Sequence, residues 1–425
     1  MSRVRHMSAM GLLGIVMLFE LSAFALLAFR SEGFDPLALL FALILIAVLF
    51  LQYVCMLWIS KYADRFILVI ANLLAAIGMI VQYRLSPDTA FKQLILYGAG
   101  LLAMFVCVAI MHKPALFQKL NWVMILGSLG LLCVLMAVGK EHGGAKNWIT
   151  IARVSFQPSE FVKLALVFVS ANYLTTRRSW RGYWPSAVFA IACCGLLVAE
   201  RDLGAALLIA LTYLILFYIA TGNVRTTLIG MGAGCMGAAA SYVTFDYVRA
   251  RVAIWKNPWA TYETSGYQIA QGLMAIASGG AWGLGLTLGS PKAIPAYNTD
   301  YIFAVICEEF GIIFGIAVIA LYLVFIIRGA LLALNARDRY LMLIAFGCTS
   351  LITLQSFIII GGVIKLIPLT GITMPFVSYG GSSLIASMML LGILEGVAMR
   401  NGEMLEDAMD AAMEECRKEE RAHAG

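Results

Sequence analysis

Three carboxylates stand at the start of one long apolar run, in the stretch "NTDYIFAVICEEFG" at 298–311: Asp300, then Glu308 and Glu309. Carboxylates are costly in hydrocarbon and rarely lie there without a partner or a role. In a regular helix the rise per residue would place the glutamates about 12–14 Å from Asp300 along the axis, whereas paired glycosidase carboxylates lie about 5–9.5 Å apart. We therefore interpret Asp300 as a single general base at the water-facing end, and the glutamates as deeper packing or cavity charges.

Other charged residues stand at the mouths of predicted helices. In "FQPSEFVKLAL", Glu160 and Lys163 are three residues apart, so they share a helix face and can pair. A structural ion pair and the charged wall of a polar cavity are both compatible with this spacing. In "AERDLGAALLI", Asp202 occupies the position of a helix N-cap, and capping alone would explain it.

Two further segments combine cations with aromatic residues or glycines. Lys146 and Trp148 in "GAKNWITIARVSFQP" suit either an interface anchor or an anionic head group. The segment 245–300 contains Arg249, Arg251 and Lys292 beside the glycine-rich "SGGAWGLGL". Glycines allow close backbone approach to a ligand, and cations bind phosphate, so this segment suggests phosphate binding at the membrane surface.

The composition decides the class of protein that carries these residues. Of the 425 residues, 62% are hydrophobic and only 13% are charged, which excludes a disordered chain and an ordinary soluble domain and indicates a polytopic membrane protein. The nine cysteines follow no disulfide or zinc spacing. No Walker loop or dinucleotide fingerprint occurs, which argues against an ATP-driven pump.

The chain contains about twelve apolar runs of a length that suits membrane-spanning helices. The runs are 8–29, 36–58, 66–83, 93–111, 121–139, 161–175, 184–199, 203–221, 226–244, 301–327, 340–362 and 381–399. With the N-terminus in the cytoplasm, every inner segment carries at least one cation, as the positive-inside rule requires. Both termini are then cytoplasmic, and the irregular segments 140–160, 245–300 and the one after 363 lie on the outer side. We expect the functional site there.

Six stretches occur in an order that resembles a known family. They are "GAKNWI", "FQPSEFVKLA", "DLGAALLI", "GYQIAQ" with "SGGAWGLGL", "NTDYIFAVICEEFG" and "PLTGITMPFVSYGGSSL". Together they resemble the shape, elongation, division and sporulation family of peptidoglycan glycosyltransferases, from near Leu68 to Met399. The family core has about ten spans, so the resemblance divides the chain into two extra N-terminal helices (1–60), a glycosyltransferase core (61–400) and an acidic, helix-prone cytoplasmic tail (401–425).

This resemblance implies an inverting enzyme of the bacterial cytoplasmic membrane that polymerises lipid II on an undecaprenyl pyrophosphate carrier, in elongation, division or sporulation. Asp300 matches the aspartate that the family uses as its base, and Glu160 and Lys163 match residues that line its central cavity. A class B penicillin-binding protein is the usual partner, a divalent cation (Mg²⁺ or Mn²⁺) has been suggested for the family, and no nucleic-acid partner is expected. The substrate-binding candidates are Lys146, Trp148, Glu160, Lys163, Asp202, Arg249, Arg251, Lys292 and Ser378.

Two other classes of function stay open at this point. One is a transporter or flippase of a lipid-linked precursor, because intramembrane charges and broken backbone suit transporters equally well. The other is a non-catalytic scaffold for a penicillin-binding protein. The position of Asp300 separates the first from an enzyme, since a base at the outer surface serves chemistry and a transport charge lies near the midplane.

Overall fold

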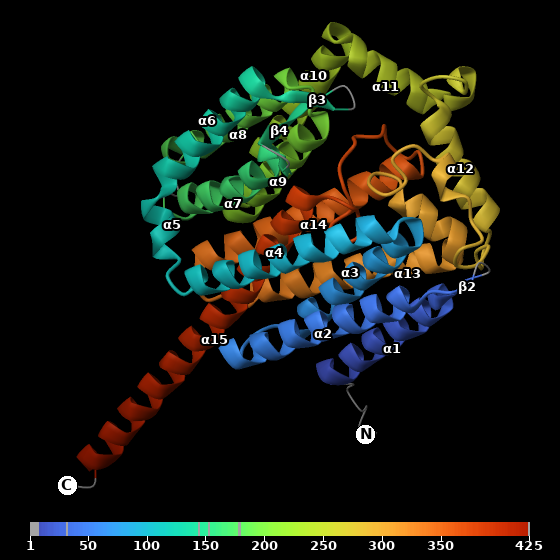
Figure 1. The fold of residues 1–425 in the computed structure, drawn as a ribbon. Helices are drawn as coiled ribbons and strands as arrows, with labels where there is room; N and C mark the ends of the chain where they lie inside the picture. Colours follow the sequence, from blue (N-terminus) through green and yellow to red (C-terminus); the bar gives the residue numbers. More distant parts are fainter. Residues whose placement is uncertain (1–7, 31–32, 143–144, 152–153, 177–179, 424–425) are drawn as a thin grey trace.

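A computed structural model of the protein describes residues 8–30, 33–142, 145–151, 154–176 and 180–423 (Figure 1). The helices are α1 (Ala9–Ala28), α2 (Pro36–Ile59), α3 (Arg65–Leu85), α4 (Pro87–Met111), α5 (Ala115–Lys119), α6 (Asn121–Val138), α7 (Pro158–Thr176), α8 (Trp180–Ala199), α9 (Leu203–Thr221), α10 (Val224–Thr244), α11 (Asp246–Lys256), α12 (Tyr267–Gly279), α13 (Ile302–Leu334), α14 (Arg339–Val363) and α15 (Gly381–His423). Two 3-10 helices, η1 (Pro258–Thr261) and η2 (Pro291–Ala293), precede and follow α12 along the chain.

Short strands occur in two of the connections. Strands β1 (Phe29–Arg30) and β2 (Gly33–Phe34) form a hairpin between α1 and α2. Strands β3 (Lys140–His142), β4 (Ala145–Ile151) and β5 (Val154–Phe156) form an antiparallel sheet between α6 and α7. The protein is therefore an all-α polytopic membrane protein, as predicted, with strands confined to connections.

The predicted count of twelve spans is not confirmed. Each predicted run is helical, but within the described residues ten helices are long and apolar enough to cross a membrane, or eleven if α10 and α11, bent by 99°, form one span. Helix α7 is not among them. Its Glu160, Lys163 and Asn172 lower its hydropathy, because charged and amide side chains are unfavourable in hydrocarbon.

The helix ends follow local rules of capping. Asp64 caps α3 by accepting from the backbone N–H groups of Phe66 and Ile67 at 3.1 and 3.2 Å. Ser86 caps α4 in the same way at Thr89, and Pro87 fits the first helical position because its missing N–H is not needed there. Because Ser86 is the single residue between α3 and α4, its cap lets the second helix follow the first directly.

The first two helices pack on the outside of a more buried core. In α3, α14 and the membrane part of α15, 78–89% of the apolar window is buried, against 33% in α1 and 39% in α2. Phe24 of α1 and Phe41 of α2 hold the pair against α3, with ring centroids 5.5 and 5.1 Å from that of Tyr83. Helices α1 and α2, which are the described helices of the predicted N-terminal addition (1–60), thus form a pair at the periphery of the bundle, and their origin as an addition stays a prediction.

Helix α13 is broken at Gly311, where φ is 88° and ψ is 165°. The break frees backbone carbonyls, and the turn after α12 enters it. Leu284 and Gly285 donate to the carbonyls of Glu308 and Glu309 at 2.9 and 3.0 Å, and Ile312 donates to Gly280 at 2.9 Å. Irregular backbone at membrane depth needs such internal partners. The glycine-rich run that suggested phosphate binding therefore has a structural use in this break.

The last helix continues without interruption beyond the membrane core. Helix α15 has 43 residues, and from 405 onward its described side chains are exposed. Figure 1 shows this part projecting away from the bundle toward the C-terminus. Within the expected solvated helix at 401–425, the described residues 401–423 form the end of α15.

Candidate functional site

Asp300 lies in a tight turn directly before α13 (296–301, the Asp300 turn), and it is half-buried. The carbonyl of Ala296, a residue with a positive φ of 55°, accepts from the backbone N–H groups of Thr299 and Tyr301, both at 3.2 Å. The ring of Tyr301 lies on Gly272 of α12, where an added Cβ would stand 2.3 Å from the ring. The side chain next to Asp300 is therefore anchored in the core while the turn itself stays partly open.

Three partners outside the turn hold its backbone. The Asn298 carbonyl accepts from the Gln82 amide of α3 and from the backbone N–H of Tyr379, both at 2.9 Å. The next carbonyl, that of Thr299, accepts from the Ser378 hydroxyl at 2.7 Å. Both peptide groups that precede Asp300 are thus fixed from outside. The buried Ser378 thus contacts the turn with its side-chain hydroxyl, and its contact with substrate stays a prediction.

The partners Ser378 and Tyr379 belong to the connection between α14 and α15 (364–380, the α14–α15 linker). This linker also lies beside the Asp300 carboxylate: a Cβ added to Gly371 would stand 3.7 Å from Oδ2 of Asp300. Lys365 and Phe376 in the linker have positive φ angles of 63° and 65°. Non-glycine residues rarely adopt that conformation, and such strain is concentrated at functional sites.

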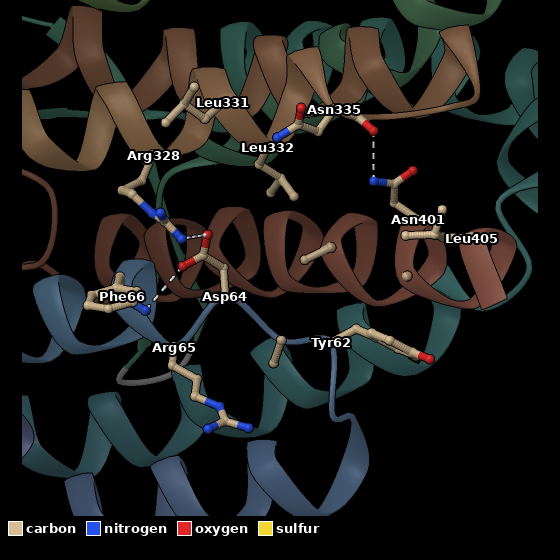
Figure 2. A pocket seen from close by; sticks show the side chains of 13 residues that line it. Tyr62, Asp64, Arg65, Phe66, Arg328, Leu331, Leu332, Asn335, Asn401 and Leu405 are labelled. Atoms are coloured by element: carbon tan, nitrogen blue, oxygen red, sulfur yellow. Dashed lines mark hydrogen bonds and ion pairs between the residues drawn. The ribbon is translucent and has the colours of Figure 1, made fainter. Parts of the chain in front are cut away.

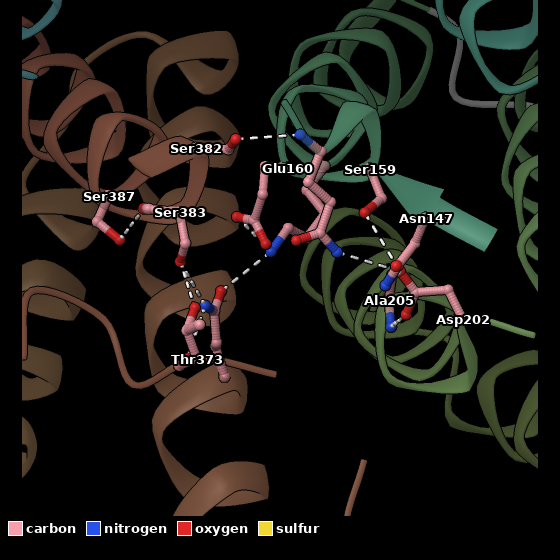
Figure 3. Close-up of polar contacts among 12 residues, drawn as sticks. Asn147, Ser159, Glu160, Asp202, Ala205, Thr373, Ser382, Ser383 and Ser387 are labelled. Atoms are coloured by element: carbon pink, nitrogen blue, oxygen red, sulfur yellow. Dashed lines mark hydrogen bonds and ion pairs between the residues drawn. The ribbon is translucent and has the colours of Figure 1, made fainter. Parts of the chain in front are cut away.

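A second polar cluster lies at the start of α7 (Figure 3). Glu160 and Lys163 form an ion pair at 2.9 Å, and both side chains are buried. Lys163 also donates to Gln355 of α14 at 3.1 Å, and Gln355 donates to the Thr373 carbonyl of the α14–α15 linker at 2.9 Å. The ion pair predicted from the spacing is confirmed, and it joins α7 to the linker that holds the Asp300 turn.

Asp202 caps α9, as its position predicted. Its Oδ1 accepts from the backbone N–H of Ala205 at 3.0 Å. Its Oδ2 accepts from Gln157 at 3.3 Å, from Ser159 at 3.4 Å and from Asn147 of β4 at 3.5 Å. The carboxylate therefore also links β4 to the start of α7 through hydrogen bonds, as Figure 3 shows.

The predicted cations lie in surrounding segments. Arg249 is exposed on α11, where it pairs with Asp246 and donates to the Val243 carbonyl at 2.8 Å. Arg251 is half-buried on the same helix, and Lys292 is exposed in η2. Lys146 and Trp148 belong to β4; Trp148 is half-buried, and the side chain of Lys146 lies outside the described part of the chain.

Helix α11 extends from one cluster toward the other. Tyr247 near its start donates to the Val198 carbonyl at 3.2 Å, and the Arg201 guanidinium lies 5.5 Å from the centre of the Tyr247 ring. Trp255 near its end donates to the Lys365 carbonyl of the α14–α15 linker at 3.0 Å. The arginines of α11 are thus carried by a helix attached to both polar clusters.

Glu308 and Glu309 are buried supports, in agreement with their interpretation from the sequence. Arg84 pairs with Glu309 at 2.8 Å and donates to the carbonyls of Thr287 and Gly289, both at 3.1 Å. Glu308 accepts from the backbone N–H of Ser290 at 2.9 Å. Together they hold the residues that lead from the glycine-rich turn toward the Asp300 turn.

The sequence did not point to Arg84 or Gln82 of α3, nor to Gln93 of α4, which donates to the Ser378 carbonyl of the α14–α15 linker at 3.1 Å. All three are polar residues at or near the end of an apolar run. That pattern was a usable signal, because a polar side chain within a predicted span usually faces a partner inside the bundle.

A pocket of ≈ 420 Å³ lies at the opposite end of α3 (Figure 2). Asp64 and Arg328 pair across it at 2.6 Å, and its walls include Tyr62 and Asn401. Helix α3 has 21 residues, so its two ends are about 30 Å apart. This pocket is therefore remote from Asp300.

The comparisons with known proteins decide the family. Residues 64–403 match the family model described as cell cycle protein, which covers FtsW, RodA and SpoVE proteins. The chain belongs to this family.

Its relatives include the peptidoglycan glycosyltransferase RodA of Mycobacterium bovis, 34% identical over 368 residues, with 80% of this chain and 78% of the relative covered. The probable peptidoglycan glycosyltransferase FtsW of Bacillus subtilis is 35% identical over 357 residues and covers 77% of this chain and 88% of its own length. Stage V sporulation protein E of the same organism is 32% identical over 353 residues, covering 79% and 96%.

Solved structures of the same fold are also similar. A chain of a peptidoglycan synthase complex, studied for its coordination of polymerization and crosslinking, matches with a TM-score of 0.70 and 26% identity, covering 79% of this chain and 97% of its own. The rod shape determining protein RodA of Thermus thermophilus matches with a TM-score of 0.62 and 25% identity, covering 80% and 97%.

Proposed function

We propose that this protein is a peptidoglycan glycosyltransferase that polymerises lipid II into glycan strands. The observation that carries the proposal is the half-buried Asp300 in a turn whose two preceding carbonyls are held by Gln82, Tyr379 and Ser378. A carboxylate held in this way is a suitable general base. The peptidoglycan glycosyltransferases among its relatives support this choice of substrate.

In the proposed reaction, Asp300 accepts the proton of the 4-hydroxyl of the N-acetylglucosamine in the incoming lipid II. The freed oxygen attacks the anomeric carbon of the growing strand from the face opposite the leaving group, so the configuration inverts. The bond to undecaprenyl pyrophosphate breaks as the new glycosidic bond forms. Because pyrophosphate is already a good leaving group, one base at the acceptor and cations near the phosphates are sufficient.

The remaining candidates receive roles that fit their surroundings. Arg249, Arg251, Lys146 and Lys292 are proposed to bind the phosphates or the anionic head group. Trp148, on the same strand as Lys146, is proposed to anchor at the interface beside them. The aromatic ring suits that position because one part of it is apolar and the other is polar.

The buried candidates are proposed to shape the cavity in which the substrate lies. The Glu160–Lys163 pair forms a charged wall, and its bond to Gln355 supports a fixed position for that wall. Asp202 and Ser378 act through the segments that they hold, the start of α7 and the Asp300 turn.

The cellular setting is part of the same proposal. We place both termini in the cytoplasm and Asp300 at the outer face, since the cations Lys61, Arg65 and Arg328 lie at the opposite end of the bundle. A class B penicillin-binding protein is the proposed partner, and the similarity to a chain of a peptidoglycan synthase complex supports it. The process served is proposed to be elongation, division or sporulation; a rod shape determining protein and a stage V sporulation protein are among the similar proteins.

A divalent cation would depend on the substrate for most of its ligands. Within the described residues, no group of three or more His, Cys, Asp or Glu side chains is placed to hold a metal ion. Mg²⁺ is commonly bound through one or two carboxylates together with substrate phosphates. The described residues thus form no metal site made of protein ligands alone, and no step of the proposed reaction depends on one.

The second candidate function is a flippase for the lipid-linked precursor. The buried Glu160–Lys163 pair and the broken helix α13 favour it, because discontinuous helices and buried charges are typical of transporters. The two functions differ in what Asp300→Asn should do, since removal of a general base stops bond formation and leaves lipid movement unaffected.

The test is polymerisation of fluorescent lipid II by the purified full-length protein, with and without its penicillin-binding partner. We expect polymer from the wild type and a loss of at least about a hundredfold for Asp300→Asn. The matched control is Glu263→Gln, an exposed carboxylate of the same 245–300 segment, which should keep full activity. No polymer from the wild type in either sample contradicts the enzyme, and a fully active Asp300→Asn contradicts the assignment of the base.

A further inference from the structure

The Gln82 side chain is fully buried near the end of α3, yet only one of the two polar atoms of its amide makes a hydrogen bond. Its nitrogen donates to the Asn298 carbonyl at 2.9 Å. Its oxygen is buried, and no group among the described residues donates to it. A buried acceptor without a donor is unfavourable, and leucine or methionine would fill the same space without that cost.

Two other buried glutamines, Gln52 and Gln93, have both amide atoms hydrogen-bonded. Gln52 accepts from the Tyr97 hydroxyl at 2.8 Å and donates to the sulfur of Met104 at 3.5 Å. Gln93 donates to the Ser378 carbonyl at 3.1 Å and accepts from the backbone N–H of Gly380 at 3.4 Å. These two amides are explained by the contacts between elements that they make. The single bond of Gln82 calls for a different explanation.

That bond is made to the backbone of the Asp300 turn. Of the groups that hold the two carbonyls before Asp300, those of Ser378 and Tyr379 come from the non-helical α14–α15 linker. Gln82 comes from α3, a helix whose apolar window is 83% buried. It therefore fixes the turn to a rigid element, while the other two bonds fix it to a segment that contains two strained residues.

We propose that Gln82 is a positioning residue for Asp300. It holds the Asn298 carbonyl so that the Asp300 carboxylate stays where it meets the hydroxyl of the acceptor sugar. This inference rests on the proposed function, because the reaction that it supports is the polymerisation described above. Catalytic groups have to be held within a fraction of an ångström, and a displacement of about 1 Å can cost about a hundredfold in rate.

The test replaces the amide by a side chain of similar shape. Gln82→Met removes the donor and the unsatisfied acceptor together, while the Asn298 carbonyl keeps its bond from Tyr379. We expect kcat for lipid II polymerisation to fall about tenfold to a hundredfold and KM to change less than about twofold. The melting temperature should stay the same or rise, because the unfavourable buried oxygen is gone. Gln82→Leu serves as a second variant if Gln82→Met does not fold.

The matched control is Gln52→Met, which removes an equally buried amide from α2. Because both atoms of Gln52 are bonded, we expect a lower melting temperature and an unchanged kcat. A merely structural Gln82 would behave like this control. An unchanged kcat in Gln82→Met, or a loss of kcat and melting temperature together, overturns the proposal.

A second measurement does not depend on the reaction. Hydrogen–deuterium exchange in the peptide that contains Thr299 and Tyr301 should become faster in Gln82→Met and stay at the wild-type rate in Gln52→Met. Unchanged exchange in Gln82→Met overturns the positioning role whatever the activity. A wild type that forms no polymer, with faster exchange in the variant, would instead refute the proposed function and leave the bond from Gln82 to the turn established.

Discussion

The two ends of the helical bundle are built in different ways. The end that carries the Asp300 turn and the α14–α15 linker (the Asp300 end) contains all five non-glycine residues with positive φ in the described chain, which are Arg201, Thr287, Ala296, Lys365 and Phe376. The end that carries Asp64, Arg328 and the projecting part of α15 (the tail end) has helices with ordinary caps and side-chain ion pairs. Strained backbone therefore distinguishes the Asp300 end, and partly exposed ion pairs between regular helices distinguish the tail end.

This difference indicates where the chain has been shaped for chemistry. Strained backbone is unfavourable and persists only where surrounding contacts overdetermine it. At the Asp300 end those contacts are buried, as in the pair of Arg84 and Glu309, whose side chains are 14% and 0% exposed. At the tail end, the side chains of the corresponding pair, Arg328 and Asp64, are 36% and 11% exposed, so water weakens the attraction between the two charges. Changes of the same kind should therefore have unequal effects at the two ends.

The largest effect is expected for Gly283→Ala at the Asp300 end. Gly283 has a φ of 84°, and an added Cβ would stand 2.3 Å from the Glu309 carbonyl oxygen inside the break of α13. We expect a loss of at least about 3 kcal/mol in the free energy of unfolding, because a positive φ and a backbone clash add together. Thermal unfolding of the purified protein measures it. Gly237→Ala on α10, where nothing lies within 4 Å, should be neutral or slightly stabilising. Equal melting temperatures for the two variants would refute the structural use of the glycine-rich turn.

The next effect is that of Arg84→Met, which leaves Glu309 buried without its cation. Removal of one partner from a buried pair typically costs about 3–5 kcal/mol, and we expect the lower end of that range because the Arg84 side chain is 14% exposed. Replacing both residues, Arg84→Met with Glu309→Met, should recover only part of the loss, since the carbonyls of Thr287 and Gly289 also lose their donor. The measurement is denaturant-induced unfolding of the three proteins. A single variant as stable as the wild type would show that the pair does not hold this segment.

Arg328→Met makes the same substitution at the tail end. Asp64 would lose its ion pair but keep its cap on α3, and the Arg328 side chain is more than a third exposed. We expect a loss of about 1 kcal/mol or less and an unchanged rate of polymerisation. A loss as large as that of Arg84→Met would contradict the contrast between the two ends.

The helices themselves could be predicted because their rule is local. Apolar runs of sufficient length are visible in the sequence, and the type and position of Asp202 predicted a helix cap. The Glu160–Lys163 pair followed from a spacing of three residues. Each of these features depends on residues that are close together in the chain, so the sequence contains what is needed to find them.

The break in α13 could not be predicted in this way. Gly311 looks like any glycine in an apolar run, and its conformation depends on backbone groups at 280–285 that enter the break. The Asp300 turn has the same character, because Gln82 and Ser378 are far from it in the chain and reach it only in the folded protein. Asp300 itself could be found from the sequence, whereas the residues that hold it required the structure.

The smallest effect concerns the exposed pair of Lys61 and Glu406 at the base of the projecting helix. Lys61 donates to Glu406 at 2.7 Å, and the Tyr62 hydroxyl donates to the other carboxylate oxygen. The Lys61 bond, followed by that of Tyr62, holds the pKa of Glu406 below its ordinary value. The same carboxylate raises the pKa of Lys61. The lowered pKa of Glu406 gives stability that is present above the ordinary pKa of a glutamate and is lost as the pH falls through the pKa of Glu406 in the folded protein. The raised pKa of Lys61 gives stability that is lost only when the pH becomes strongly alkaline.

Glu406→Gln should therefore lower the melting temperature slightly at neutral pH. The difference from the wild type should shrink as the pH falls below about 4.3, the ordinary pKa of a glutamate, and vanish below the lowered pKa of Glu406 in the folded protein. Added salt should reduce the difference as well, since both side chains are largely solvated. Glu414→Gln is the control, because its partner Lys418 lies on the same projecting helix and its loss should not change the melting temperature of the bundle. A difference for Glu406→Gln that persists unchanged in acid would mean that packing of Glu406, and not its charge, ties α15 to the tail end.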